Sequence, residues 1–343
     1  MNAHRRVMDC LGGFPTDRAP VFAVLGAYGG KLTGTTMSRL YRDAEAWVAG
    51  QKAVQDTFGL DMALATFDYS AIAEAFGGET AWSERQAPTM KRPGAASSAQ
   101  ALAMPLPDPD RTGALPSILS ATRLMADLYR ERVPLFAVVP GPCSLPSLIL
   151  GMEAWMDTLL FEEDAAERVM DRSDEFFASW VGALQAAGAD GIVVTEGMAC
   201  AEMSPRALFE ARMLPRLRTA FARSRGPLVF HHGGGRINHI LDLLPGLPGL
   251  AGVVVSSKDD LAEARRLVGP KLPLIGNLDN LGFPSASASD IRARCRDCLR
   301  AAAGGPFVLS HSAADIPLES PPENIAAMLE ASRAWASGDR EGP

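Results

Sequence analysis

Two adjacent histidines close a short apolar run in the second half of the chain. His231 and His232 follow the apolar residues 227–230 and precede three glycines, Gly233 to Gly235. The chain holds five histidines, so this one point takes two of them. A buried strand that stops at titratable side chains and a glycine-rich turn is typical of a strand that opens into a site. Imidazole titrates near neutrality and can exchange protons with a substrate.

Other apolar runs also end on polar side chains. Asp68 follows residues 62–67, Glu196 follows residues 191–195, and His311 lies just beyond residues 307–309. We predict four catalytic residues from these positions, namely Asp68, Glu196, His231 and His311. Three residues at or next to strand ends, namely Tyr69, His232 and Asn277, form part of a predicted substrate-binding set. Lys258 is a further polar residue at a strand end. Each has a structural explanation when taken alone, since an aspartate can cap a helix, an asparagine can form a turn, and a lysine can be solvated.

A glycine-rich segment follows the first apolar run, residues 20–25. Residues 26–31 contain Gly26, Gly29 and Gly30 together with Tyr28 and Lys31, and we interpret them as a loop. Backbone amides of such a loop can cradle an anion, although the spacing is not that of a P-loop and the lysine could simply be solvated. Tyr28 and Lys31 complete the predicted substrate-binding set.

Eight short apolar runs, separated by helix-sized segments, must position these residues. Runs without polar alternation are typical of strands buried on both faces, and helical crossovers imply a parallel sheet. The sequence therefore predicts an α/β fold, a (β/α)8 TIM barrel, in which all eight strands direct their carboxyl ends to one face. A doubly wound open sheet is the alternative, but no G-x-G-x-x-G follows the first run. The eight runs are residues 20–25, 62–67, 134–139, 191–195, 227–230, 251–255, 272–275 and 307–309.

The remaining segments fit around one barrel domain. We expect a helical N-terminal extension over residues 1–19 and a hairpin-like excursion near residues 77–104, which is polar and broken by prolines and glycines. The barrel domain is predicted to cover residues 1–337, and residues 338–343 are predicted to be a disordered tail.

Composition excludes several classes of function. The net charge of −7 and the lack of a basic cluster argue against nucleic-acid binding. No apolar run is long enough to cross a bilayer, and the N-terminus has no signal-peptide pattern. Five scattered cysteines suggest reduced thiols, so we expect a cytoplasmic protein. Apolar residues expected on the barrel exterior (Trp155, Phe161 and Trp180) allow a homodimer.

The chain resembles the uroporphyrinogen decarboxylase superfamily, which also includes cobalamin-dependent methyltransferases related to methylcobamide:coenzyme M methyltransferase. The resemblance spans nearly the whole chain and implies a (β/α)8 barrel. It rests on the order and spacing of Asp17-Arg18-Ala19-Pro20-Val21, Phe67-Asp68, Glu74-Ala75-Phe76-Gly77, Gly188-Ala189-Asp190-Gly191 before Glu196, Ser204-Pro205, the His231 turn, Gly276-Asn277-Leu278-Asp279, and Ile316-Pro317 through Pro322-Glu323-Asn324-Ile325.

The resemblance also indicates what this chain lacks. The decarboxylase holds substrate carboxylates with an arginine-rich segment, but residues 26–34 contain only Lys31. Asp68 and His311 match its aspartate and C-terminal histidine, whereas Leu148 or a neighbour replaces its tyrosine. The thiol methyltransferases bind zinc with a His-x-Cys turn and a late cysteine. His231 matches that histidine, but Gly233 replaces the first cysteine, and the late position falls near Ala313 or Ala314.

The first hypothesis is therefore a corrinoid-dependent methyltransferase that has lost the thiolate zinc site. A small substrate would bind at the barrel mouth, and a separate protein would carry the corrinoid, because this chain has no Asp-x-His-x-x-Gly motif. Zinc could still bind through His231 and Glu196, although metal-free acid–base chemistry is favoured over it. The alternatives are a decarboxylase or lyase of a small carboxylic acid, and a barrel without catalytic activity.

Overall fold

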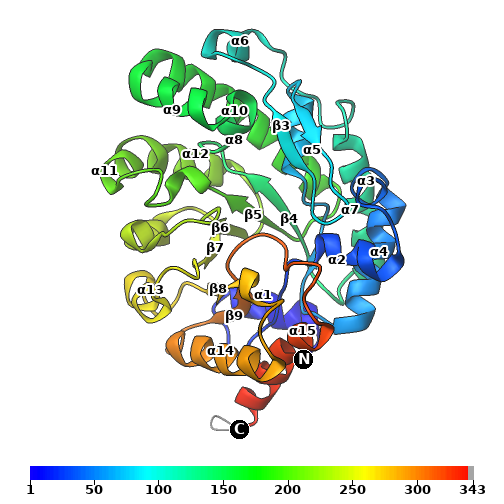
Figure 1. Ribbon diagram of the computed structural model, residues 1–343. Coiled ribbons are helices and arrows are strands. Elements are labelled where there is room, and N and C mark those ends of the chain that lie inside the picture. Colours follow the sequence, from blue (N-terminus) through cyan, green and yellow to red (C-terminus); the bar gives the residue numbers. More distant parts are fainter. Residues whose placement is uncertain (339–343) are drawn as a thin grey trace.

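Seven parallel strands form one curled sheet in the computed structural model, which describes residues 1–338. The strands follow the sheet in the order β1-β4-β5-β6-β7-β8-β9, and every neighbouring pair is parallel. Helices surround the sheet (Figure 1). The strands are β1 (Ala63–Leu64), β4 (Leu135–Pro140), β5 (Gly191–Thr195), β6 (Leu228–His231), β7 (Leu250–Val254), β8 (Leu274–Leu278) and β9 (Phe307–His311).

The first predicted strand, residues 20–25, is not a strand in the structure. It forms a single parallel bridge between Val21 and Leu309 of β9. Its backbone is nevertheless bonded on both sides. Phe22 N donates to Leu309 O at 3.0 Å, and Asp61 N donates to Val21 O at 2.9 Å. The prediction of eight regular strands is therefore wrong at this segment, because it is held mainly by isolated hydrogen bonds.

Helices occupy most of the segments between strands, as the sequence predicts. Capping residues set several of their ends. Asp43 caps α4, and Ser287 with Asp290 forms a capping box on α14. The helices are α1 (Ala3–Leu11), α2 (Gly26–Thr33), α3 (Met37–Arg42), α4 (Ala44–Phe58), α5 (Tyr69–Ala75), α6 (Ser98–Ala103), α7 (Leu115–Tyr129), α8 (Leu145–Leu150), α9 (Met152–Phe161), α10 (Glu163–Ala186), α11 (Arg206–Leu208), α12 (Leu214–Arg223), α13 (Leu261–Val268), α14 (Ala288–Ala301) and α15 (Pro322–Ala336).

Four segments with 3-10 or π-helical geometry lie between these helices and strands. They are the 3-10 segments Gly197–Ala199, Asn238–Gly246 and Asn280–Gly282 and the π-helical segment Phe209–Met213. Across residues 1–338, no helix combines the length and apolar character needed to span a membrane.

The excursion predicted near residues 77–104 does contain a hairpin. Strands β2 (Glu79–Ala81) and β3 (Thr89–Arg92) pair antiparallel, and helix α6 ends the segment. The tail predicted for residues 338–343 lies outside the described residues except for Gly338.

Two further expectations are corrected. Residues 26–31 were expected to form a loop, but they lie in helix α2. The glycines there serve helix packing, because a Cβ on Gly29 would lie 2.8 Å from the backbone of Gly50 in α4. Trp155 and Trp180 are buried and do not face outward, whereas Phe161 is 79% exposed.

The N-terminal helix α1 packs into the interior of the curled sheet, at the end away from the carboxyl ends of the strands. Val7, Cys10 and Leu11 of α1 join an apolar cluster with inward residues of the strands, including Phe136 and Val308. Burial of these side chains fills the interior at one end of the curled sheet. A cavity remains toward the carboxyl ends of the strands.

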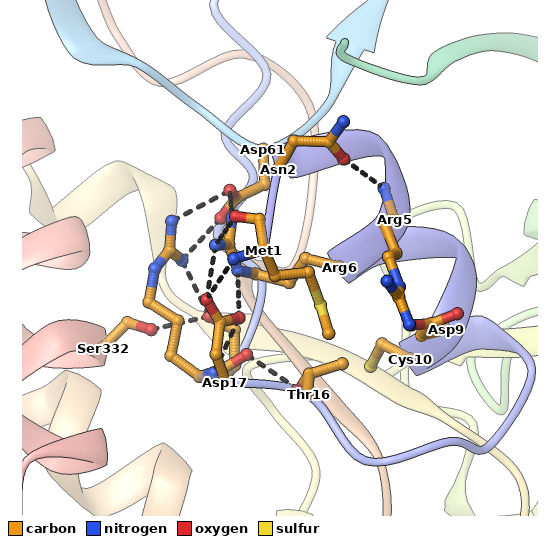
Figure 2. Close-up of polar contacts among 12 residues, drawn as sticks. Met1, Asn2, Arg5, Arg6, Asp9, Cys10, Thr16, Asp17, Asp61 and Ser332 are labelled. Carbon is orange, nitrogen blue, oxygen red and sulfur yellow. Dashed lines mark hydrogen bonds and ion pairs between the residues drawn. The ribbon is translucent and has the colours of Figure 1, made fainter. Parts of the chain in front are cut away.

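The buried carboxylate of Asp61 binds segment 20–25 just before the start of β1. Asp61 is 1% exposed, and its oxygens accept hydrogen bonds from Arg6 Nη1 at 2.7 Å, from Arg18 Nη1 at 2.6 Å, and from the Val21 amide at 2.8 Å. Arg6 also binds Asp17, as Figure 2 shows. A buried charge needs such pairing, because desolvation without a partner is strongly unfavourable. The Asp17-Arg18-Ala19-Pro20 motif thus serves the fold at this point.

We predict that Asp61→Asn lowers the free energy of unfolding by about 3–5 kcal/mol, because it removes the negative charge that the buried Arg6 and the half-buried Arg18 share. Chemical denaturation monitored by circular dichroism measures the change. The matched control is Asp56→Asn, which removes an exposed ion pair with Lys52 and should cost less than about 1 kcal/mol. Equal losses in the two variants would contradict the role given to Asp61.

Candidate functional site

A cavity of about 210 Å³ lies inside the curled sheet, toward the carboxyl ends of its strands. Its wall is mostly apolar and contains Phe22, Phe67 and several valines. The polar residues that line it are Tyr69, Thr195, His231, Ser310 and His311. The lining includes no Asp, Glu, Lys or Arg among the described residues, so the cavity offers hydrogen-bonding groups without fixed charge.

His231 ends strand β6 and lines the cavity. Its Nδ1 accepts a hydrogen bond from the amide of Gly233 at 2.9 Å. A ring nitrogen that accepts from an amide carries no proton in the neutral imidazole, so the proton is on Nε2. The glycine turn thereby fixes the tautomer and leaves one N–H for a ligand.

His311 ends strand β9 and lines the same cavity, but in the opposite tautomer. Its Nε2 accepts from the amide of Val24 at 2.8 Å, so the proton is on Nδ1. Nδ1 is buried and has no hydrogen-bond partner among the described residues. Segment 20–25 therefore orients this histidine and leaves its Nδ1–H as a buried donor without an acceptor.

Both imidazoles are neutral at pH 7. Burial lowers the pKa of His311 to about 4. Burial also lowers the pKa of His231 well below its ordinary value, and the nearby His232 and His311 add to the effect. The two histidines are therefore hydrogen-bond donors near neutrality, and they do not place a cation in the cavity.

His232 lies behind His231 and does not line the cavity. The two rings stack with centroids 4.7 Å apart, and His232 Nδ1 accepts from the Gly234 amide at 2.8 Å. Burial lowers the pKa of His232 to about 4. The structure thus distinguishes the two neighbours, which sequence alone could not do.

Tyr69 lines the cavity from the start of helix α5. Its hydroxyl lies against Thr195, and burial raises the pKa of this phenol, with a further contribution from the nearby Glu196. Phe67 packs edge-on against the Tyr69 ring at 4.8 Å. Thr195 and Ser310 were not among the predicted site residues, although both stand at or next to a polar strand end.

Asp68 lies between the cavity residues Phe67 and Tyr69 in the sequence, but its carboxylate makes its contacts away from the cavity. Its carboxylate caps α5 through the Ala71 amide, accepts from Ser70 Oγ at 2.5 Å, and accepts from Arg42 at 2.6 Å. Arg42 also binds Glu74 at 2.8 Å. Asp68 thus joins α3 to α5 beside the mouth and does not line the cavity.

Glu196 follows Thr195 and points to the other side of β5. Its carboxyl group bonds Ser144 Oγ and accepts from the Cys143 amide at 3.2 Å. Burial raises the pKa of Glu196 to about 8, although the bonds from Ser144 and Cys143 oppose the shift. The residue therefore fixes the loop after β4 from behind the cavity wall.

The other predicted binding residues are engaged in structural contacts. Tyr28 donates to Ser320 O at 3.1 Å, and Lys31 donates to Leu318 O at 2.6 Å. Asn277 donates to Ser256 O at 2.9 Å and to Asp259 O at 3.2 Å. None of the three lines the cavity, and neither does Lys258.

The residues present do not fit a thiolate zinc site. Gly233, Ala313 and Ala314 line the cavity where the family resemblance places cysteines. A Cβ on Gly233 would lie 2.5 Å from the Cα of Gly197, and φ at Gly233 is +69°, so the turn has no room for a side chain. Within residues 1–338, no three His, Cys, Asp or Glu side chains gather closely enough to hold a metal ion.

The loop after β9 contributes a half-buried carboxylate that sequence reasoning missed. Asp315 accepts from the Gly26 amide at 2.6 Å and from the Ala27 amide at 3.3 Å, at the start of α2. Burial raises the pKa of Asp315 to about 6. The contact holds the loop that carries Ala313 and Ala314 over the cavity. No local sequence pattern links residues so far apart.

Comparisons with known proteins agree with this architecture. A family model described as uroporphyrinogen decarboxylase (URO-D) matches residues 2–335. The methylcobamide:CoM methyltransferase MtaA of Methanosarcina barkeri is 24% identical over 332 residues, covering 95% of this chain and 96% of the relative. The uroporphyrinogen decarboxylase of Alkalilimnicola ehrlichii is 27% identical over 350 residues, covering 95% and 92%.

A solved structure gives the same result for the fold. A methyltransferase from Methanosarcina mazei superposes with a TM-score of 0.88 at 20% identity, covering 98% of this chain and 99% of that one.

We predict that nuclear magnetic resonance of ¹⁵N-labelled protein at pH 7 finds neutral His311 with its proton on Nδ1 and neutral His231 with its proton on Nε2. His311 should titrate near pH 4. Because its folded pKa lies below the unfolded value of 6.5, its contribution to stability should be lost as pH falls from 6.5 toward 4. Titration of His311 near pH 6.5 would refute the electrostatic description of the cavity.

A second prediction concerns the crowded turn. Gly233→Ala should cost about 1–3 kcal/mol more than Gly34→Ala, which is the matched control. Both glycines have φ near +70°, but a Cβ on Gly34 would meet nothing within 4 Å. The cost of placing alanine at a positive φ is therefore the same in both variants. The difference between their unfolding free energies measures the clash with Gly197. Equal costs would show that the turn can relax to admit a side chain.

Proposed function

Because the chain belongs to the uroporphyrinogen decarboxylase family, we propose that it is a methyltransferase that moves a methyl group between a small uncharged substrate and the cobalt of a corrinoid. A separate protein would carry the corrinoid and dock over the cavity mouth. The methyltransferase relatives, which align over nearly the whole chain, support this choice at the family level.

One observation carries the proposal, namely an uncharged cavity with two neutral imidazoles on its wall. His231 and His311 would orient a substrate oxygen with their N–H groups and stabilise negative charge that develops there. In this proposal, residues 20–25 take the place of an eighth strand and close the barrel around the cavity. Their backbone bonds to β9 and to Asp61 support that role.

The same cavity disfavours decarboxylation. Loss of carbon dioxide leaves a carbanion, which needs a nearby cation or proton donor, and the substrate carboxylate itself needs a partner. The described lining residues include no lysine or arginine, and both histidines are neutral. A porphyrinogen with eight carboxylates would find no binding groups here.

Two of the predicted catalytic residues take supporting roles in this proposal. Asp68 would hold the rim through Arg42, and Glu196 would hold the loop after β4. The five cysteines are all free thiols, which favours a reducing compartment such as the cytoplasm.

We predict that the purified protein converts free cob(I)alamin to methylcob(III)alamin when supplied with a suitable neutral methyl donor. The absorption spectrum of the corrinoid follows the reaction. His311→Ala should lower the rate roughly a hundredfold, as loss of one preorganised hydrogen-bond donor does. His4→Ala is the control, because His4 lies in α1 at the opposite end of the sheet, and its rate should be unchanged.

Failure of every methyl donor to alter the corrinoid would contradict the proposed transfer. Release of carbon dioxide from a small acid, lost in His311→Ala, would identify a decarboxylase instead.

A further inference from the structure

We infer that copies of this chain associate head to tail, with an acidic and apolar tip of one copy held in a groove of the next. The tip is residues 157–164, at the end of α9 and the start of α10. The groove lies beside α1, between residues 13–16 and the segment that precedes β9. This contact is separate from the cavity and from the methyl transfer proposed above.

The tip exposes two large apolar side chains in succession. Leu160 is 55% exposed and Phe161 is 79% exposed, so both contribute little to the core of their own chain. A single exposed leucine is normal on a protein surface. Aromatic side chains such as Phe161 are enriched at protein–protein interfaces, where they enter pockets of the partner and anchor the contact. Phe161 is therefore placed as an anchor for a partner.

Carboxylates surround this apolar pair. The tip contains no lysine or arginine, and all four of its acidic residues are exposed. They are Asp157, Glu162, Glu163 and Asp164. Arg212 pairs with Glu163 and neutralises only that member of the set. A partner that covers the tip must therefore offer an apolar recess with cations around it.

A recess of this kind is present on the same chain. The groove has a volume of about 450 Å³, and the side chains along it are mainly apolar, including Phe14, Pro270 and Leu299. The described residues that line it include no Asp, Glu, Lys or Arg. Phe14 is 64% exposed at this groove, so an entering phenylalanine contacts both an aromatic ring and aliphatic groups.

The rim of the groove carries the charge opposite to that of the tip. Three exposed cations lie within two residues of lining residues in the sequence, namely Lys271, Arg300 and Arg333. Asp297 pairs with Arg300 at 2.8 Å and neutralises it in part, so Lys271 and Arg333 supply most of the positive charge. The two surfaces thus match in apolar character and in charge, which favours their association over contacts between like surfaces.

The two surfaces lie on opposite sides of the molecule. Helix α9 precedes the tip, and helix α14 supplies Leu299 to the groove, and these helices flank the sheet from opposite sides (Figure 1). The tip of one chain therefore meets the groove of another chain. A contact between unlike surfaces repeats from copy to copy, and it ends in a closed ring or in an open chain of subunits. Because the groove lies at the α1 end of the sheet interior, a tip bound there leaves the cavity uncovered.

Sedimentation velocity of the full chain measures this association. The contact has one aromatic anchor and a small groove, so we expect reversible association in the micromolar range, with species larger than a dimer as concentration rises. Sodium chloride should weaken the association, because it screens exposed charges. A chain that stays monomeric at its highest soluble concentration would overturn the inference.

Two variants separate the two surfaces. Phe161→Glu removes the anchor from the tip, and Ala303→Glu places a carboxylate in the groove, where Ala303 is exposed. Each variant alone should associate at least about thirtyfold more weakly than the native chain, as loss of an interface hot spot does. An equimolar mixture should form a dimer and nothing larger, because the intact tip of one variant still fits the intact groove of the other.

The mixture distinguishes this contact from the alternatives. A mixture that stays monomeric would overturn the inference, and so would native-like association of either variant alone, since that would place the contact on one surface only. Leu281→Glu is the matched control, because Leu281 is 73% exposed outside both surfaces, and its association should equal that of the native chain.

A charge reversal tests the rim without altering either apolar surface. Lys271→Glu should weaken association several-fold and reduce its dependence on salt, because it removes an exposed cation that faces the carboxylates of the tip. Association that keeps both its native strength and its native salt dependence in Lys271→Glu would contradict the charge matching on which the inference rests.

Discussion

The architecture of the site depends on one buried carboxylate. Asp61 receives hydrogen bonds from two arginines and from the amide of Val21, and so fixes residues 20–25 between β1 and β9. That segment forms no regular strand, and the ion pair compensates for the missing ladder. The position of this segment places the Val24 amide against His311 Nε2, and the hydrogen bond between them sets the tautomer of His311. A contact at one end of the sheet thus decides which nitrogen carries a proton in the cavity.

Packing then divides the sheet interior into two parts. Helix α1 fills one end with apolar side chains, and the cavity remains at the other. The wall is apolar because the inward residues of parallel strands are core residues along most of their length. The histidines at the strand ends are consequently desolvated and neutral. The cavity is suited to an uncharged ligand because its wall is apolar and because burial in that wall keeps both histidines neutral.

Much of this arrangement could be predicted from the sequence, and particular residues show where prediction stopped. Unalternating apolar runs located β4 to β9 within a few residues, and the residues that close β6 and β9 gave His231 and His311. Glu196 directly follows the inward Thr195, and a shift of one residue reverses the face of a strand. Asp68 is held by Arg42 through a contact that no local pattern reveals. Residues 26–31 form a helix whose Gly29 packs on Gly50, and glycine content alone does not disclose that contact.

The most direct test of the central claim compares zinc content with methyl transfer. Protein treated with chelator and protein loaded with zinc would each be analysed for metal and assayed for methylation of cob(I)alamin. The account predicts equal rates, because Gly233 and Ala313 provide no thiolate at the cavity. A rate that rises in proportion to bound zinc, and disappears when zinc is removed, would contradict it.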